Sequence, residues 1–284
     1  MTGARPPTVR AVQLGRELRY LREEKRLTME EVGAVTGWSA AKLSRIENAR
    51  TRATIKDVTA LLDLYAAAAD RRERLVRLAR TARERGWWEA FDGSISESLT
   101  TYIGLEDDAA RVDAFTSGAF NGLLQTEDYA RAVIATAPRP LPPGVVGRRV
   151  EVRMRRQARL TGPEPLRLDT VLEEAALRRR IAGPDVMRAQ FRYMAEMGER
   201  DNVSVRILPF DRGPYPLSAL SFSLMRFPGG LRSDVVYLEA LSGGAVIEED
   251  EEVFLYTLMW DRLRQLALPE DESRDLLLDL AARF

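Results

Sequence analysis

A short polar and basic segment between Ser39 and Arg52 carries the side chains whose types and spacing could do chemistry. Arg45 is long enough to reach base edges in a major groove, where a guanidinium can donate two hydrogen bonds to guanine. Small residues and free backbone amides at a helix amino terminus allow close approach to DNA and bind phosphate. The segment therefore predicts a contact surface for double-stranded DNA. The candidate DNA-binding residues are Ser39, Ala40, Ala41, Lys42, Ser44, Arg45, Asn48, Arg50 and Arg52.

These residues divide into two expected roles. Arg45 and Lys42 are expected to read or approach bases, with a short contact added by Ser44. Phosphates are expected to be held by Ser39, Asn48, Arg50 and Arg52. The alternative without function is a compact helical hairpin with a solvated charged face, which is what charge runs usually are.

Local signals predict the helices that position this surface. Residues 12–25 carry an apolar stripe with three arginines outside it, which is typical of an amphipathic helix. Thr28 and Glu31 have the spacing of a capping box, and Gly37 permits a tight turn before a helix capped by Ser39. Thr54 begins a further helix.

Glu47, at the end of the predicted recognition helix, is expected to be structural. Its place favours an ion pair with an arginine of the first helix, such as Arg16, over a direct contact with a base.

Composition excludes several other kinds of site. The 284 residues include no cysteine and no histidine, which removes disulfide frameworks, thiolate nucleophiles, the usual zinc sites and the commonest general base. We expect no cofactor and no metal. No apolar run approaches the roughly 18 residues of a membrane span, and the amino terminus has no secretory core, so a cytoplasmic protein is expected.

The net charge of zero hides an asymmetry between the two parts of the chain. Residues 1–91 contain 19 basic and 12 acidic side chains, and the remainder carries the compensating negative excess. A basic module followed by an acidic body is typical of a nucleic-acid binder joined to another domain.

The pattern predicts an all-α helix-turn-helix domain at 1–69, a solvated connecting helix at 70–90 and an α+β domain at 91–284. Trp87 and Trp88 are interpreted as packing anchors. Residues 102–137 are predicted to form two helices separated by Ser117 and Gly118. Strands are predicted at 165–172, 203–210, 219–227 and 234–241, the last two as an antiparallel hairpin, in a small and largely antiparallel sheet. Helices are predicted at 145–160, 174–180, 185–199, from the acidic run 248–252 through 268, and from 270 to the end.

Several polar groups of the larger domain adjoin apolar runs: Gln125, Glu127, Asp128, Glu173, Glu174 and Glu239. A partly buried carboxylate needs a partner, so Glu239 is expected to meet an arginine, with Arg178 or Arg179 as candidates. A ligand pocket at Glu239 is the alternative.

Two resemblances add to this interpretation. The segment LTMEEVGAVTGWSAAKLSRIENAR resembles the helix-turn-helix of Xre/Cro-like repressors, over residues 12–65. Where that family often has glutamine after the capping threonine, this chain has Met29, which implies the loss of a base or phosphate contact. From about Glu84 to Arg283, the motifs RERGWW, YIGLE, GLLQTEDYARA, VLEEAALRR, NVSVRILPF, DVVYLEAL and DRLRQLAL resemble the WhiJ-like, or Scr1-type antitoxin-like, effector domain, a domain of unknown function (DUF5753).

The resemblances imply a transcription factor encoded beside a small acidic partner protein that opposes it. The first hypothesis is a homodimeric repressor that reads a palindromic operator and receives a signal through its acidic domain. The second is an antitoxin-like interaction protein that neutralises a partner, with DNA binding serving autoregulation. A third hypothesis, an enzyme using Glu173 and Glu174, is disfavoured because adjacent side chains point in different directions. We therefore expect no enzymatic activity.

Overall fold

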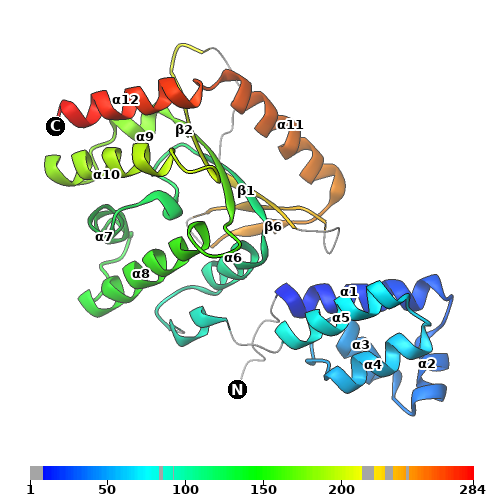
Figure 1. Cartoon of the computed structure of the whole chain (residues 1–284). Coiled ribbons are helices and arrows are strands. Elements are labelled where there is room, and N and C mark those ends of the chain that lie inside the picture. The colour runs from blue at the N-terminus through cyan, green and yellow to red at the C-terminus, as the bar shows by residue number, and fades with distance from the viewer. Residues whose placement is uncertain (1–8, 83–85, 92, 213–220, 228–232, 241–242) are drawn as a thin grey trace. The chain divides into compact units, whose positions relative to one another are not determined.

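The chain forms two compact units, Met1–Glu89 and Ala90–Phe284, in a computed structural model (Figure 1). The structure describes residues 9–82, 86–91, 93–212, 221–227, 233–240 and 243–284. Each unit is built around its own hydrophobic core, and each is described by itself.

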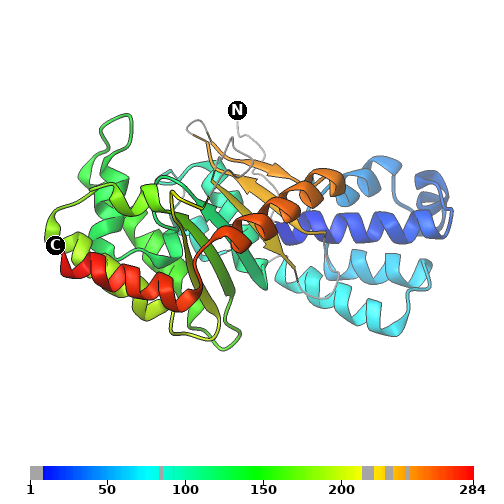
Figure 2. The ribbon, with the colours of Figure 1, turned by 90° about the horizontal axis from the view of Figure 1, so that it is seen from above.

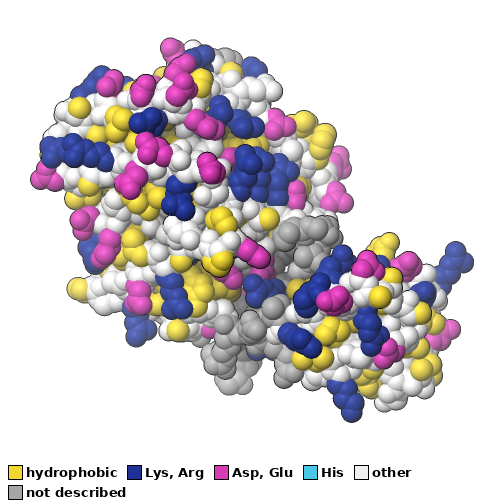
Figure 3. Space-filling view, in the orientation of Figure 1, with side chains coloured by type: hydrophobic (Ala, Val, Ile, Leu, Met, Phe, Trp, Pro, Cys, Tyr) yellow, Lys and Arg dark blue, Asp and Glu magenta, His cyan; other side chains and the backbone are white. Residues whose placement is uncertain are grey.

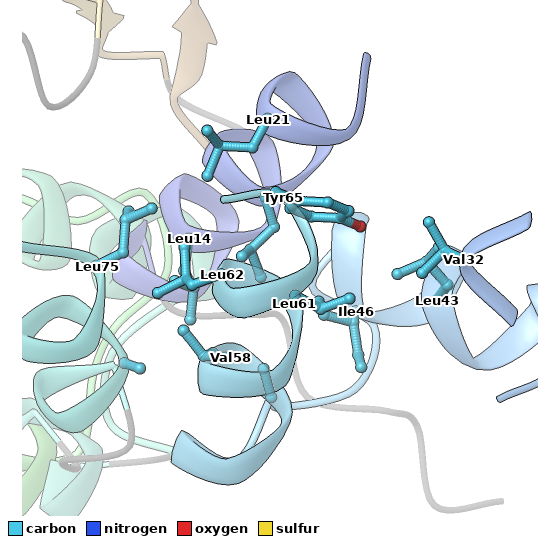
Figure 4. Close-up of a cluster of buried hydrophobic side chains, with 13 residues drawn as sticks. Leu14, Leu21, Val32, Leu43, Ile46, Val58, Leu61, Leu62, Tyr65 and Leu75 are labelled. Atoms are coloured by element: carbon cyan, nitrogen blue, oxygen red, sulfur yellow. The ribbon is translucent and has the colours of Figure 1, made fainter. Parts of the chain in front are cut away.

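The first unit consists of five helices. They are α1 (Val9–Glu24), α2 (Met29–Thr36), α3 (Ala40–Glu47), α4 (Ile55–Leu64) and α5 (Ala69–Thr81). Leu18 of α1, Leu43 of α3 and Leu61 of α4 are fully buried in one cluster to which all five helices contribute. Figure 4 shows this cluster, with Val32 beside Leu43 and with Tyr65 among the leucines. The predicted helical character of this region is confirmed.

The fifth helix corrects one prediction. The arginine-rich run was expected to be a solvated connecting helix at 70–90, but Leu75 and Ala79 of α5 are fully buried in the core of the first unit. Arg71 of α5 also contacts Glu17 of α1, with 2.9 Å between Nη2 and Oε2. Leu75 and Ala79 lie four residues apart on the face that packs into the core, while charged residues occupy most of the other positions, so the charge run concealed a core element. Residues 83–85 of the predicted helix lie outside the described residues.

The second unit is organised around a mixed sheet of six strands. They are β1 (Arg111–Thr116), β2 (Arg167–Glu173), β3 (Val203–Leu208), β4 (Phe222–Arg226), β5 (Val235–Leu238) and β6 (Ala245–Ile247), in the spatial order β3-β2-β1-β4-β5-β6. β1, β2 and β3 are parallel, and β4, β5 and β6 continue the sheet as antiparallel strands. The expectation of a small, largely antiparallel sheet is therefore wrong, while the α+β class and the β4–β5 hairpin are confirmed.

Strand β1, in the middle of the sheet, was predicted as part of a helix. Its neighbours α6 (Glu97–Asp108) and α7 (Glu127–Ala135) are helical, but RVDAFT between them is extended. Four consecutive residues, Val112 to Phe115, are buried, so the strand lacks the alternation by which half-buried strands are recognised. Its central Asp113 is fully buried, and Arg111 donates to Asp113 Oδ1 at 2.7 Å.

Helices cover both faces of the sheet. Figure 1 shows α7, α8 (Pro143–Arg156) and α10 (Pro184–Met197) on one side and α11 (Asp250–Leu266) on the other. Trp260 and Leu263 of α11 pack on Phe115 and Leu224. Figure 2 shows α11 followed along the unit by α12 (Glu270–Ala282). The remaining elements are α9 (Glu174–Arg178) and the short 3-10 helices η1 (Trp87–Phe91), η2 (Gly122–Leu124) and η3 (Gln157–Leu160).

The outer edge of β3 is covered by the segment that joins α11 to α12. The Leu268 amide donates to the Ile207 carbonyl at 2.8 Å, and the Ile207 amide donates to Ser273 Oγ at 3.0 Å. Residues 219, 220 and 241, at the ends of two predicted strands, lie outside the described residues. Within the described part of the chain, no helix is long and apolar enough to cross a membrane.

Candidate nucleic-acid interface

The turn between α2 and α3 has the local chemistry that the sequence predicted. Thr28 Oγ1 accepts from the Glu31 amide at 3.2 Å, and the Thr28 amide donates to Glu31 Oε2 at 2.8 Å, which completes a capping box. Gly37 has φ of 72°, in the left-handed region where glycine is unstrained, and its amide donates to the Gly33 carbonyl. Ser39 then caps α3 by accepting from the Lys42 amide at 3.1 Å. These caps fix where α3 begins.

A buried ion pair fixes the other end of α3. Arg22 donates from Nε to Glu47 Oε1 at 2.7 Å and from Nη2 to Glu47 Oε2 at 3.0 Å, and its Nη1 donates to the Leu27 carbonyl at 2.8 Å. Glu47 is 4% exposed and Arg22 is 7% exposed. The hydrogen bond to Glu47 raises the pKa of Arg22, and burial together with the Glu47 charge raises the pKa of Tyr65 beside the pair.

The structural role of Glu47 is thus supported, and its partner is an arginine of the first helix, as predicted, although it is Arg22 and not Arg16. Arg16 is exposed, whereas Arg22, which was placed outside the apolar stripe, turns inward. Six residues of an α-helix rotate a side chain by about 240°, so Arg16 and Arg22 of α1 point in different directions.

Lys42 is also held within the first unit. Its Nζ lies 2.8 Å from Asp57 Oδ1 and 3.7 Å from the centroid of the Trp38 ring. Asp57 also closes a second capping box, since the Thr54 amide donates to Asp57 Oδ2 at 2.9 Å. Burial raises the pKa of Asp57, but the hydrogen bonds from Lys42 and Thr54 outweigh it and lower this pKa overall. Lys42 therefore joins α3 to the start of α4.

Four of the remaining predicted residues, in α3 and at its carboxyl-terminal cap, gather on one outward face, and Ala40 is half-buried. Ala41, Ser44, Arg45 and Asn48 are related by spacings of three and four residues, so they lie on the same side of the helix. Ala41, Arg45 and Asn48 are exposed, while Ser44 is half-buried. Asn48 Nδ2 donates to the Ser44 carbonyl at 2.8 Å, which satisfies one of the last carbonyls of the helix.

Two further exposed arginines, Arg50 and Arg52, follow α3 along the chain. Arg45, Arg50 and Arg52 are exposed, and none of them forms an ion pair with another described residue. This contrasts with Arg19, Arg22 and Arg71, whose charges are matched by glutamates. Cations without carboxylate partners are available for phosphates.

The structure adds one residue that the sequence reasoning missed. Lys56, in the first turn of α4 and four residues after Arg52, is exposed and has no ion-pair partner among the described residues. Its position just after the Thr54 cap, in the first turn of a helix, is the feature of the sequence that could have indicated it. Met29, in contrast, packs against the hydrophobic core of the first unit, so an apolar side chain at this position contributes to packing.

The second unit contains another cluster of polar and charged side chains, at the carboxyl-terminal end of α8. Arg156 forms two hydrogen bonds of 2.7 Å with the buried Glu106, and its guanidinium lies 4.9 Å from the Tyr102 ring centroid. Arg153, one turn earlier, donates from Nη1 to Gln125 Oε1 at 2.7 Å. Burial and the neighbouring charge of Arg156 lower the pKa of Arg153 to about 10.

The expected partner of Glu239 was wrong. Arg178 pairs with Glu174 on its own helix, and Glu239 is exposed. Its negative charge acts instead on two other arginines: it opposes the lowering of the Arg153 pKa and adds to the rise of the Arg156 pKa. Glu239, which directly follows β5, therefore lies near α8, a long-range placement that no local pattern could indicate.

Three of the other polar residues singled out in this unit have partners within it. Gln125 is buried and donates from Nε2 to the Phe120 carbonyl at 2.6 Å. Glu127 pairs with Arg131 one helical turn away. Glu174 accepts from the Phe210 amide at 3.1 Å as well as from Arg178.

The capped α2 and α3, the anchored end of α3 and its exposed basic face are the parts of a helix-turn-helix DNA-binding module, followed here by an α+β domain. Comparison with known families agrees with this class. The model described as Helix-turn-helix domain matches residues 13–75, and the model described as Domain of unknown function (DUF5753) matches residues 99–279. The chain belongs to the DUF5753 family. No curated protein and no solved structure shows significant similarity to it.

Proposed function

We propose that this protein is a sequence-specific transcriptional regulator that acts as a dimeric repressor in the cytoplasm and has no catalytic activity of its own. The observation that carries the proposal is the outward face of α3. Exposed Arg45, Arg50 and Arg52 have no ion-pair partners among the described residues, while Glu47 and Arg22 lock the helix beneath them. A rigid helix that presents free guanidinium groups suits a major groove and the phosphates beside it.

Within this proposal the basic residues have different roles. Arg45 projects from α3 and reads a base edge, with Ser44 beside it. Arg50, Arg52 and Lys56 hold phosphates after the helix ends, together with the free backbone amides near Ser39. Lys42, which is held by Asp57 and Trp38, positions α3 against α4 and approaches the DNA less closely than Arg45.

The test is binding to the DNA upstream of the protein's own gene, measured by fluorescence anisotropy with a random duplex as control. Arg45→Ala should weaken binding to the upstream DNA by about 1–3 kcal/mol and reduce the preference over random duplex. Arg52→Ala should weaken binding to both duplexes to a similar extent. Arg131→Ala, an exposed arginine of the second unit, should change neither.

Equal losses on both duplexes for Arg45→Ala and Arg52→Ala would show that α3 does not read the sequence. Equal binding of the unmodified protein to both duplexes would contradict sequence-specific regulation itself.

We further propose that the second unit receives the signal through the Arg153 cluster. This guanidinium is half-buried and has no carboxylate in hydrogen-bond contact among the described residues. An acidic group, carried by a small partner protein or a ligand, would complete its pairing.

The version of this proposal in which the signal is a small partner protein is tested by co-purification of this chain with the product of an adjacent reading frame. Arg153→Gln should reduce capture of that product, while Arg148→Gln, an exposed arginine of the same helix, should not. If the Arg153→Gln variant captured as much of that product as the unmodified protein does, the Arg153 cluster would not be the site that receives the signal.

A further inference from the structure

Helix α11 exposes three large apolar side chains on its outer side. Phe254 is 59% exposed, Leu255 is 60% exposed and Leu258 is 50% exposed. Their spacing of one and four residues places them on one side of the helix, whereas Val253, Trp260 and Leu263 bury the opposite side against the sheet. Figure 3 shows hydrophobic side chains and acidic side chains together at the outer edge of α11. An apolar cluster of this kind on a surface marks an interaction site.

Opposite charges lie at the two ends of this apolar cluster. Glu251 lies three residues before Phe254, and Arg262 lies four residues after Leu258, so both share its side of the helix. Both are exposed, and neither forms an ion pair with another described residue. Along the middle of the outer face the order is therefore acidic, apolar and basic, with the exposed Asp261 to one side of Arg262.

We propose that this face of α11 pairs with the same face of α11 in a second copy of the chain, with the two helices antiparallel. A twofold axis midway between Tyr256 and Thr257 places Leu255 opposite Leu258 of the second copy. The same axis places Glu251 opposite Arg262. In an isologous pair each of these contacts occurs twice.

Charge complementarity selects a second copy as the occupant. The order of acidic, apolar and basic residues complements itself only when reversed, which is what a twofold axis provides. With 17 residues, α11 extends over about 25 Å, so the two charges stand clear of the apolar centre and can form ion pairs at its rim. This inference rests on the proposed dimeric regulator, for which it supplies the interface.

Charge reversal gives a sharp test, measured as the dimer dissociation constant by sedimentation equilibrium of the full chain. Glu251→Arg sets two arginines against each other at both ends of the pair, and Arg262→Glu sets two glutamates against each other. Each variant alone should raise the dissociation constant at least tenfold. An equimolar mixture of the two should form a heterodimer, and the chain with both reversals should dimerise like the unmodified protein.

Asp275→Arg, an exposed charge reversal on α12, is the matched control and should dimerise normally. The proposal is overturned if the unmodified chain is monomeric, if the single reversals dimerise normally, or if the mixture fails to associate. DNA binding is measured separately on the same proteins. If the two variants form the expected heterodimer but the unmodified protein shows no preference for the upstream DNA, the proposed regulator is refuted and the proposed interface is not. If the unmodified protein is monomeric but still prefers the upstream DNA, only the proposed interface is refuted.

Discussion

At the scale of single residues, the buried pair of Arg22 and Glu47 gives the most direct stability prediction. Glu47→Gln leaves the Arg22 guanidinium inside the first unit without its countercharge, and such a loss costs about 3 kcal/mol. Glu23→Gln removes an exposed partner of Arg19 that also lies 3.5 Å from Arg22, and it should cost much less than Glu47→Gln because exposed ion pairs contribute little. Urea unfolding followed by hydrogen exchange of peptides from α1 to α4 measures both. Similar losses for the two variants would contradict a stabilising role of the buried pair.

Asp57 makes the first unit sensitive to acid. Its pKa in the folded protein is lowered overall, below the unfolded value of about 3.9. The stabilisation is therefore fully present above about pH 4 and is lost as the pH falls through the folded pKa. Asp57→Asn should be less stable than the unmodified protein at pH 7, and the difference should narrow as the pH falls below 4. Urea midpoints at both pH values measure this, with Asp63→Asn as an exposed control.

For the candidate site, the sequence could predict which residue types are present but not which partners they contact. The sequence shows Ser39, Arg45 and Arg52 as candidates because the polarity of Ser39, the charge of the two arginines and their position after a turn glycine are local properties. The attachment of Lys42 to Asp57 and of Glu47 to Arg22 joins different helices, so it depends on how the helices pack. The sequence predicted that Glu47 pairs with an arginine of the first helix, but its spacing could not distinguish Arg16 from Arg22.

At the scale of elements, α1 and α3 approach so closely that only glycine fits at Gly15. A Cβ atom there would lie 2.4 Å from the Glu47 carbonyl oxygen. Gly15→Ala should therefore destabilise the first unit by about 1–3 kcal/mol through overpacking, although alanine is the better helix former. Gly147→Ala in α8 has nothing within 4 Å and should stabilise its unit by up to about 1 kcal/mol. Opposite shifts in local hydrogen exchange would confirm the close approach, and a stabilised Gly15→Ala would disprove it.

The sequence predicted elements well where their limits are set by neighbouring residues. Thr28, Ser39 and Thr54 cap the expected helices because a cap needs only the next three residues. β1 was missed because both its faces are buried, and β6 has only three residues. Parallel pairing of β1 with β2 joins residues 56 positions apart, from Arg111 and Arg167 to Thr116 and Leu172, and no local pattern encodes such a pairing.

At the scale of the whole molecule, a chain of zero net charge should bind DNA with a strong dependence on salt. The basic excess is confined to residues 1–91, and only charges near phosphates release counterions. In a dimer, Arg52→Ala removes one phosphate contact from each copy, so it should reduce the slope of log affinity against log salt by about two. Anisotropy titrations between 50 and 200 mM salt test this, and an unchanged slope would place Arg52 away from the DNA.

The covering of β3 limits how copies of this chain can associate in unwanted ways. An open strand edge is a template on which further chains add, which leads to aggregation and domain swapping. At this edge of β3 the carbonyl and the amide of Ile207 are already occupied, by the Leu268 amide and by Ser273 Oγ. Strand-to-strand polymerisation at that edge would first require the α11–α12 connection to detach, so misassembly there is opposed by the stability of the carboxyl-terminal helices.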